Sequence, residues 1–137
     1  MTQERRSGRD TEFGVWLRAH PELDSKLGFV ATNVDYIWEN YKTGEWMIIE
    51  EKRNMKRPKF YQERIFNRLA ECCKHDKKFC GFHILIFERS NPEDGRIYWD
   101  DKEITKEELI KILRFDKSIK KKYNIISSEE GSVEVGI

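Results

Sequence analysis

The chain has 137 residues, of which 37% are charged and 38% hydrophobic, and its formal net charge is only +1. This length fits one domain. Because the net charge is so small, the chain as a whole is not a polycation that would bind nucleic acid through its overall charge. Any such binding needs local basic patches or a bound metal. No run of about 18 apolar residues occurs, so the sequence predicts no membrane span.

The two ends of the chain differ in character from its middle. The start, MTQERRSGRD, has no apolar core that would mark a secretory signal, and the chain holds three cysteines. We therefore expect a cytoplasmic protein with reduced thiols. Residues 1–9 are predicted to be a flexible basic tail and residues 124–137 a loosely ordered C-terminal tail, with a single domain making up the chain.

The first half predicts a helix, two strands and a second helix. A short helix capped by Asp10 or Thr11 is expected to run to His20, where Pro21 stops it. Residues 29–39 and 46–52 are rich in β-formers, and NYKTGE between them is typical of a hairpin turn. Pro58 opens a helix that is expected to reach about residue 74.

The second half predicts two further strands and a last helix. Residues 79–88, FCGFHILIFE, form the most apolar run, and RIYWD follows the turn NPEDG. Thr105 and Glu108 have the spacing of a capping box before the helical pattern KEELIKILRF. The order α-β-β-α-β-β-α predicts an α/β or α+β fold, with a mixed central sheet of about four strands flanked by helices.

The stretch WMIIEEK, residues 46–52, combines a buried-strand pattern with three charged residues at its end. Because side chains alternate along a strand, Glu50 and Lys52 share one face. If residues 29–39 pair antiparallel with this strand, Asp35 lies near Glu50. Two carboxylates that converge repel each other unless a cation lies between them, and Mg²⁺ suits such oxygen ligands. The pattern therefore predicts a metal site.

These residues resemble the PD-(D/E)XK nuclease superfamily. The resemblance rests on VD at 34–35, on Glu50-x-Lys52 within IIEEK, and on the helix beginning near FYQ; Val34 replaces the proline of the superfamily name. It covers roughly residues 10–100 and implies a restriction-endonuclease-like core. The implied activity is Mg²⁺-dependent hydrolysis of DNA phosphodiester bonds by metal-activated water, with Mn²⁺ as a substitute. Small nucleases of this kind are frequent in phages and mobile elements, and a phage-encoded protein of this kind would act in the host cytoplasm.

The same resemblance implies a role for each site residue. Asp35, Glu50 and the backbone carbonyl of Glu51 would bind the metal, and Lys52 would position the attacking water. Glu12 on the first helix is a further candidate ligand and catalytic residue. Gln62, on the helix after the lysine, matches a catalytic glutamine of some branches.

A basic run follows the proposed site and is expected to contact DNA phosphates. The residues concerned are Arg53, Lys56, Arg57, Lys59 and Arg64. The sequence has no separate recognition domain, which favours structure-directed cutting or action within a larger complex. The expected partners are DNA and either a second copy of the chain or an accessory protein.

Other readings of the same residues remain open. A non-catalytic nucleic-acid-binding or assembly module could keep the fold, and an unrelated α/β interaction domain could carry the acids on its surface. Cys72, His75, Cys80 and His83 have spacings that suggest zinc. However, Cys80 and His83 are three apart in a predicted strand and so face opposite sides. No zinc and no iron–sulfur cluster is expected.

Overall fold

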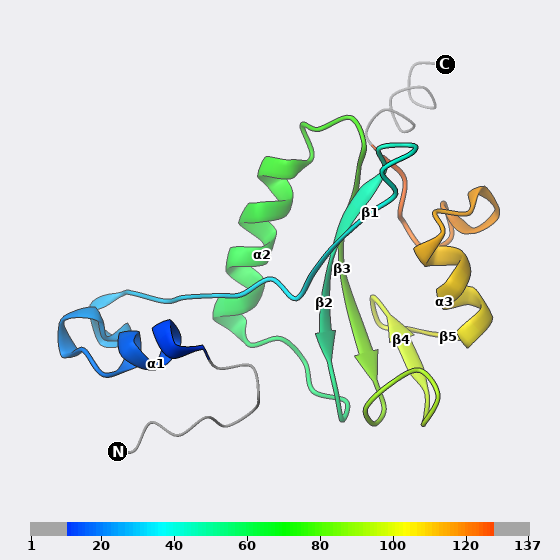
Figure 1. Cartoon of the computed structure of the whole chain (residues 1–137). Helices are drawn as coiled ribbons and strands as arrows, with labels where there is room; N and C mark the ends of the chain where they lie inside the picture. The colour runs from blue at the N-terminus through cyan, green and yellow to red at the C-terminus, as the bar shows by residue number, and fades with distance from the viewer. Residues whose placement is uncertain (1–10, 128–137) are drawn as a thin grey trace. The chain divides into compact units, whose positions relative to one another are not determined.

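The computed structural model describes residues 11–127, and the chain divides into two compact units, Met1–Asn33 and Val34–Ile137 (Figure 1). The predicted flexible tail over residues 1–9 lies outside the described residues, as do residues 128–137. Within the described part, no helix is long and apolar enough to cross a membrane.

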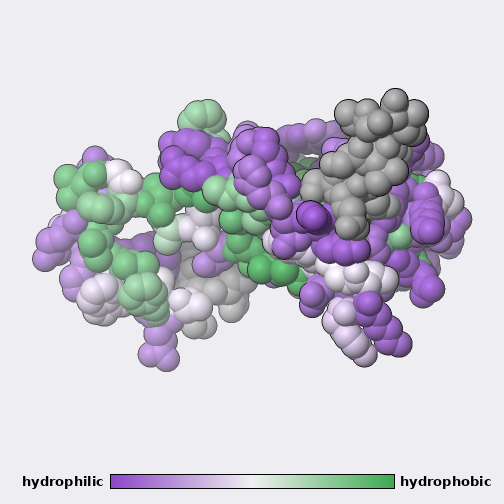
Figure 2. Space-filling view, turned by 90° about the horizontal axis from the view of Figure 1, so that it is seen from above, coloured by the Kyte–Doolittle hydropathy of each residue, from purple (hydrophilic) through white to green (hydrophobic). Residues whose placement is uncertain are grey.

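The N-terminal unit is built from one short helix and two 3₁₀ turns. Helix α1 spans Glu12–Arg18 and begins where Thr11 Oγ1 accepts the Gly14 amide proton at 3.0 Å, so the predicted helix start at Thr11 is confirmed. The 3₁₀ turns η1 (Pro21–Leu23) and η2 (Ser25–Leu27) follow. No described residue of this unit is buried, and its hydrophobic residues, green in Figure 2, lie at the surface.

The second unit contains a five-stranded mixed sheet in the order β1-β2-β3-β4-β5 (Figure 1). The strands are β1 (Tyr36–Glu39), β2 (Trp46–Lys52), β3 (Phe79–Phe87), β4 (Ile97–Trp99) and β5 (Lys102–Ile104). Strands β2 and β3 are parallel, and the other neighbours are antiparallel. The chain is therefore of the mixed α and β class.

Two strand predictions need correction. The sheet has five strands instead of about four, because the short strand Lys102–Ile104 pairs with β4 between the predicted RIYWD strand and the last helix. Two of its three residues are exposed and charged, so its pattern resembles a loop. The β-rich run 29–39 yields only the strand Tyr36–Glu39, which leaves Asp35 immediately before β1.

One helix lies on each side of the sheet (Figure 1). Helix α2 spans Phe60–Cys73, close to the predicted bounds, and Phe66 stacks on Phe82 of β3 with ring centroids 4.6 Å apart. Helix α3 spans Lys106–Leu113 and is followed by the 3₁₀ turn η3 (Lys117–Ile119). The predicted capping box is confirmed, since Thr105 and Glu108 exchange bonds of 2.8 and 3.0 Å.

The main hydrophobic core lies on the α3 side of the sheet. It includes Met47, Ile49, Leu85, Trp99, Ile112 and Ile125, each less than one tenth exposed. The C-terminal tail was expected to be loose from residue 124 onward, but Ile125 is fully buried and Ser127 is 2% exposed. Residues 125–127 therefore pack into the fold, because Ile125 fills a place in the core.

A bulge in β3 overturns the expected orientation of Cys80 and His83. Trp46 pairs with Phe79 and Ile48 with Phe82, so β3 carries one extra residue at this point. Gly81 has φ +106°, a conformation that L side chains rarely adopt. Cys80 lies in the α3-side core with Trp99, and His83 stacks on Trp99 at 4.7 Å, so both lie on the same side. The rings of His83 and Trp99 pack against each other in the interior. The prediction that Cys80 and His83 face opposite sides of the sheet, which was used against a zinc site, was therefore wrong.

Candidate active site

Strand β2 separates the core from the candidate site by simple alternation. Met47 and Ile49 point into the α3-side core, whereas Glu50 and Lys52 lie on the face of α2. The carboxylate of Glu50 is nevertheless withdrawn from water, since the residue is 3% exposed. Lys52 is partly buried, with 18% of its side chain exposed. The charged end of the strand is therefore inside the fold and is not a solvated strand edge.

Asp35 lies beside Glu50 because of the register of the first hairpin. Tyr36 pairs with Ile49, and one further step along this antiparallel register brings Asp35 opposite Glu50. The Asp35 carboxylate accepts the Glu51 amide proton at 2.9 Å, which fixes its position where the β1 strand has not yet begun. The structure thus brings together the two carboxylates that the sequence predicted to converge.

Lys52 and Gln62 complete the group. Lys52 Nζ lies 3.5 Å from Glu50 Oε2 and donates a hydrogen bond to Gln62 Oε1 at 3.2 Å. The same Gln62 oxygen accepts the Lys59 amide proton at 2.9 Å, at the start of α2. The Gln62 side chain is therefore held by the helix N-terminus and in turn orients the Lys52 ammonium.

The electrostatics of Glu50 set it apart from an ordinary surface acid. Burial, followed by the negative charge of Asp35, raises the pKa of Glu50 from 4.5 to about 7, and Lys52 offsets only part of this shift. Glu50 Oε1 is buried and has no hydrogen-bond partner among the described residues. Such a raised pKa and an unsatisfied oxygen are typical of functional sites.

Glu51 faces the opposite side of the sheet with two partners. Its carboxylate pairs with Arg53 Nε at 2.9 Å and accepts a longer hydrogen bond from Tyr36 Oη at 3.4 Å. Because the N–H and C=O of one residue point to the same side of a strand, the Glu51 carbonyl points toward Asp35 as its amide does. Tyr36 was not singled out from the sequence, although the alternation that separates it from Asp35 would have placed it on the face of Glu51.

The predicted phosphate-contacting residues fall into two groups. Arg53 is paired with Glu51, and Arg57 forms a two-pronged ion pair with Asp101 at 2.7 and 3.0 Å. The other three, which are exposed and make no ion pair within residues 11–127, are Lys56, Lys59 and Arg64. Asp101 was not singled out from the sequence, because 44 residues separate it from Arg57.

Glu12 occupies the first turn of α1 and is exposed. It belongs to the N-terminal unit, whereas Asp35, Glu50 and Lys52 belong to the second unit. Its proposed contribution to a metal site stays a prediction.

The donor set suits a hard cation with a small number of protein ligands. Across residues 11–127, no group of three or more His, Cys, Asp or Glu side chains gathers in a way that could hold a metal. Mg²⁺ is commonly held by one or two carboxylates, with waters and substrate phosphates at the remaining positions. The unsatisfied Glu50 Oε1 and the adjacent Asp35 carboxylate fit this pattern.

Comparisons with known proteins identify no relative: no family model, no curated protein and no solved structure matches the chain. The resemblance to the PD-(D/E)XK superfamily therefore stays a prediction that depends on the residues quoted from the sequence.

Proposed function

We propose that the protein is a Mg²⁺-dependent nuclease of the PD-(D/E)XK type that hydrolyses phosphodiester bonds in DNA. The observation that carries the proposal is the buried Glu50 carboxylate, which has the Asp35 carboxylate beside it and Lys52 Nζ at 3.5 Å. A strand end that only met water would not bury an acid whose pKa is raised to about 7. Structure-directed cutting, or action within a larger complex, suits a catalytic module of this size.

Each residue has a separate task in this proposal. Asp35, Glu50 and the Glu51 carbonyl would hold the cation. Bound Mg²⁺ supplies a Lewis acid that polarises a phosphoryl oxygen and makes water a stronger nucleophile. The Lys52 ammonium donates a hydrogen bond to the attacking water or stabilises the charge that develops on the phosphate, and Gln62 holds this ammonium through a 3.2 Å hydrogen bond. Lys56, Lys59 and Arg64 contact the DNA backbone.

A second candidate function is a nucleic-acid-binding or assembly module that has kept the nuclease fold without its activity. The observation that favours it is the contact between Lys52 and Glu50. The lysine charge compensates part of the charge of the buried acid, so a metal ion is not needed for this purpose. In such a module the group would be a structural polar cluster, and metal would not bind it.

One experiment separates the two candidates. Purified protein is incubated with plasmid, linear, single-stranded and four-way-junction DNA in Mg²⁺, Mn²⁺ or EDTA, beside an Asp35→Asn and Glu50→Gln double variant. Cleavage that needs metal and is lost in the variant supports the nuclease. Absence of cleavage on every substrate, together with no heat of Mn²⁺ binding above that of the variant, rejects it in favour of the binding module.

A further inference from the structure

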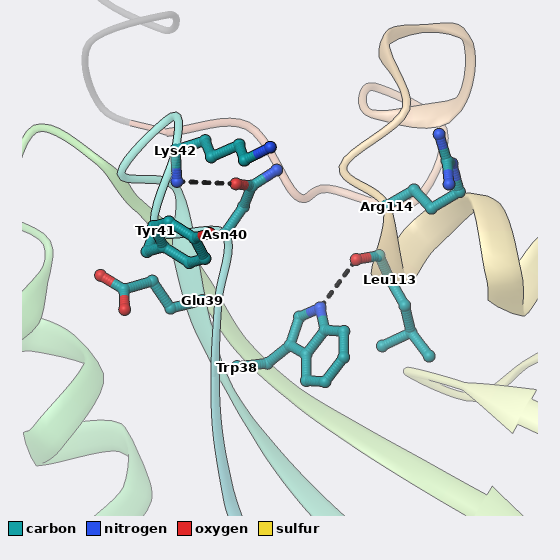
Figure 3. A pocket seen from close by; sticks show the side chains of 7 residues that line it. All are labelled: Trp38, Glu39, Asn40, Tyr41, Lys42, Leu113 and Arg114. Carbon is teal, nitrogen blue, oxygen red and sulfur yellow. Dashed lines mark hydrogen bonds between the residues drawn. The ribbon is translucent and has the colours of Figure 1, made fainter.

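A cavity of about 340 Å³ opens at the turn end of the β1–β2 hairpin, where the hairpin approaches the end of α3 (Figure 3). Its lining comes from Trp38, Glu39, Asn40, Tyr41 and Lys42 on the hairpin and from Leu113 and Arg114 at the end of α3. The volume lies in the lower part of the range for small-ligand pockets, roughly 300–1,000 Å³. Trp38 pairs with Met47, so the cavity lies on the α3 side of the sheet, opposite to Glu50.

Both aromatic side chains of the cavity are exposed, and that of Trp38 is held in place. Trp38 is 43% exposed, and its indole N–H donates a 2.7 Å hydrogen bond to the Leu113 carbonyl, which fixes the ring (Figure 3). Tyr41 is 81% exposed in the turn, where the Asn40 side chain accepts the Lys42 amide proton at 2.9 Å. A ring that is already oriented loses little entropy when a flat partner stacks on it.

The lining of the cavity carries two cationic side chains and one carboxylate, a formal net charge of +1. Lys42 and Arg114 both line it, are exposed and make no ion pair within the described residues. The Asp116 carboxylate near Arg114 accepts two hydrogen bonds from Ser118, at 2.7 and 2.9 Å. The acid of the lining, Glu39, extends away from Trp38 and Leu113 in Figure 3. The cavity therefore presents a flat aromatic surface beside two cations.

We propose that this cavity binds one nucleotide unit of single-stranded nucleic acid, with its base stacked on Trp38 and its phosphate held by Lys42 and Arg114. Stacking on exposed aromatic rings combined with cations along the backbone is how proteins bind single strands without reading their sequence. The inference goes beyond the proposed function, because binding here requires neither metal nor cleavage and lies on the other face of the sheet.

The test measures fluorescence anisotropy of a labelled ten-residue oligothymidylate in EDTA, with an abasic decamer of the same charge as the matched ligand. We expect the wild type to bind the oligothymidylate about 5- to 150-fold more tightly than the abasic strand, the range that corresponds to stacking of one base. Trp38→Ala should remove this difference, and Trp38→Phe should keep part of it. Tyr41→Ala serves as a second aromatic variant. Because the Tyr41 side chain is largely exposed, its removal is not expected to affect folding.

Charge reversal tests the phosphate contact. Lys42→Glu and Arg114→Glu should weaken binding of both strands about tenfold or more, whereas Arg68→Glu, an equal charge change at an exposed site of α2, should weaken it much less. The proposal is overturned if the abasic strand binds as tightly as the oligothymidylate, or if Arg68→Glu costs as much as Arg114→Glu. It is also overturned if an acidic peptide displaces the strand at equal concentration. Loss of cleavage in any assay has no bearing on these outcomes, so failure of the proposed nuclease activity is distinguishable.

Discussion

The two faces of the sheet in the second unit are built differently. On the α3 side, Trp99, Ile112 and Ile125 are fully buried, and the chain after α3 closes the core. On the α2 side, Phe66 is the one residue of the helix that is buried; the sheet residues Ile48 and Ile86 are buried, whereas Phe82 and Ile84 are only partly covered. The second face also holds the buried charge of Glu50 and its partner Lys52.

This difference shows how one strand can serve stability and chemistry together. The residues of β2 that face α3 contribute apolar burial, which stabilises the fold by roughly 25 cal/mol per Å². The residues that face α2 include a carboxylate whose burial is unfavourable. Since the α3 side holds most of the core, the α2 side can tolerate an arrangement that is electrostatically strained.

The largest effect is expected from a large-to-small substitution in the core on the α3 side of the sheet. Trp99→Ala should destabilise the fold by about 3–5 kcal/mol, because it leaves a cavity and removes the ring on which His83 stacks. Phe82→Ala, on the partly covered face, should cost clearly less. Urea unfolding of both variants measures the difference, and equal losses would contradict the contrast between the faces.

Next in size is the effect of Lys52 on the proposed cleavage. Lys52→Ala should slow single-turnover DNA cleavage by about 10²–10³-fold, the usual cost of losing one preorganised donor. Mn²⁺ binding, followed by calorimetry at pH 8.5, should persist, because Lys52 is not a ligand. The alkaline pH matters, since Lys52 lowers the pKa of Glu50 and its loss leaves that acid harder to ionise. A variant that cuts at nearly the wild-type rate would remove Lys52 from the mechanism.

The buried acid predicts a pH dependence of stability. Because the pKa of Glu50 is about 7 in the fold and 4.5 as its ordinary value, the unfolded chain loses this proton first as the pH rises. The wild type should therefore lose stability between about pH 4.5 and pH 7 and change little above. Glu50→Gln should abolish this part of the slope and be more stable than the wild type at pH 8, by on the order of 1–3 kcal/mol.

Thermal unfolding from pH 4 to pH 8, with and without Mg²⁺, measures this effect. Mg²⁺ should raise the melting temperature of the wild type more at pH 8 than at pH 6, because the ionised acid binds it, and should leave Glu50→Gln unchanged. Parallel pH profiles of the two proteins would show that Glu50 is not the group that titrates.

The smallest effect concerns the exposed lysines near the site. Lys56→Glu with Lys59→Glu should weaken binding of duplex DNA by about tenfold and flatten its dependence on salt. Arg57 is better left unchanged, since its reversal would place a carboxylate against Asp101. If the salt dependence of binding is identical for the variant and the wild type, these lysines do not contact DNA and are ordinary solvent-exposed residues.

Local patterns predicted the elements better than their assembly. The Thr105 cap, the helix after Pro58 and the apolar run at 79–88 all depend on neighbouring residues, and each is found where the sequence placed it. The strand Lys102–Ile104 was missed because its pairing with β4, and not its own composition, makes it a strand.

The candidate site shows the same limit. The alternation of β2 and the hairpin predicted that Asp35, Glu50 and Lys52 come together. The ion pair of Arg57 with Asp101 joins distant parts of the chain, and no local pattern signals it. The burial of Glu50 was equally hidden, since exposure of a strand end depends on how α2 covers it.

Gly81 is in effect an inserted residue. Without Gly81, Cys80 would lie directly between Phe79, which pairs with Trp46, and Phe82, which would still pair with Ile48. The ladder between the two strands would then be regular. Every other side chain of β3 would then keep the face that it has now, because the bulge adds one position without reversing the alternation on either side. A deletion of this one residue is therefore expected to leave the register of Glu50 against Ile84 the same.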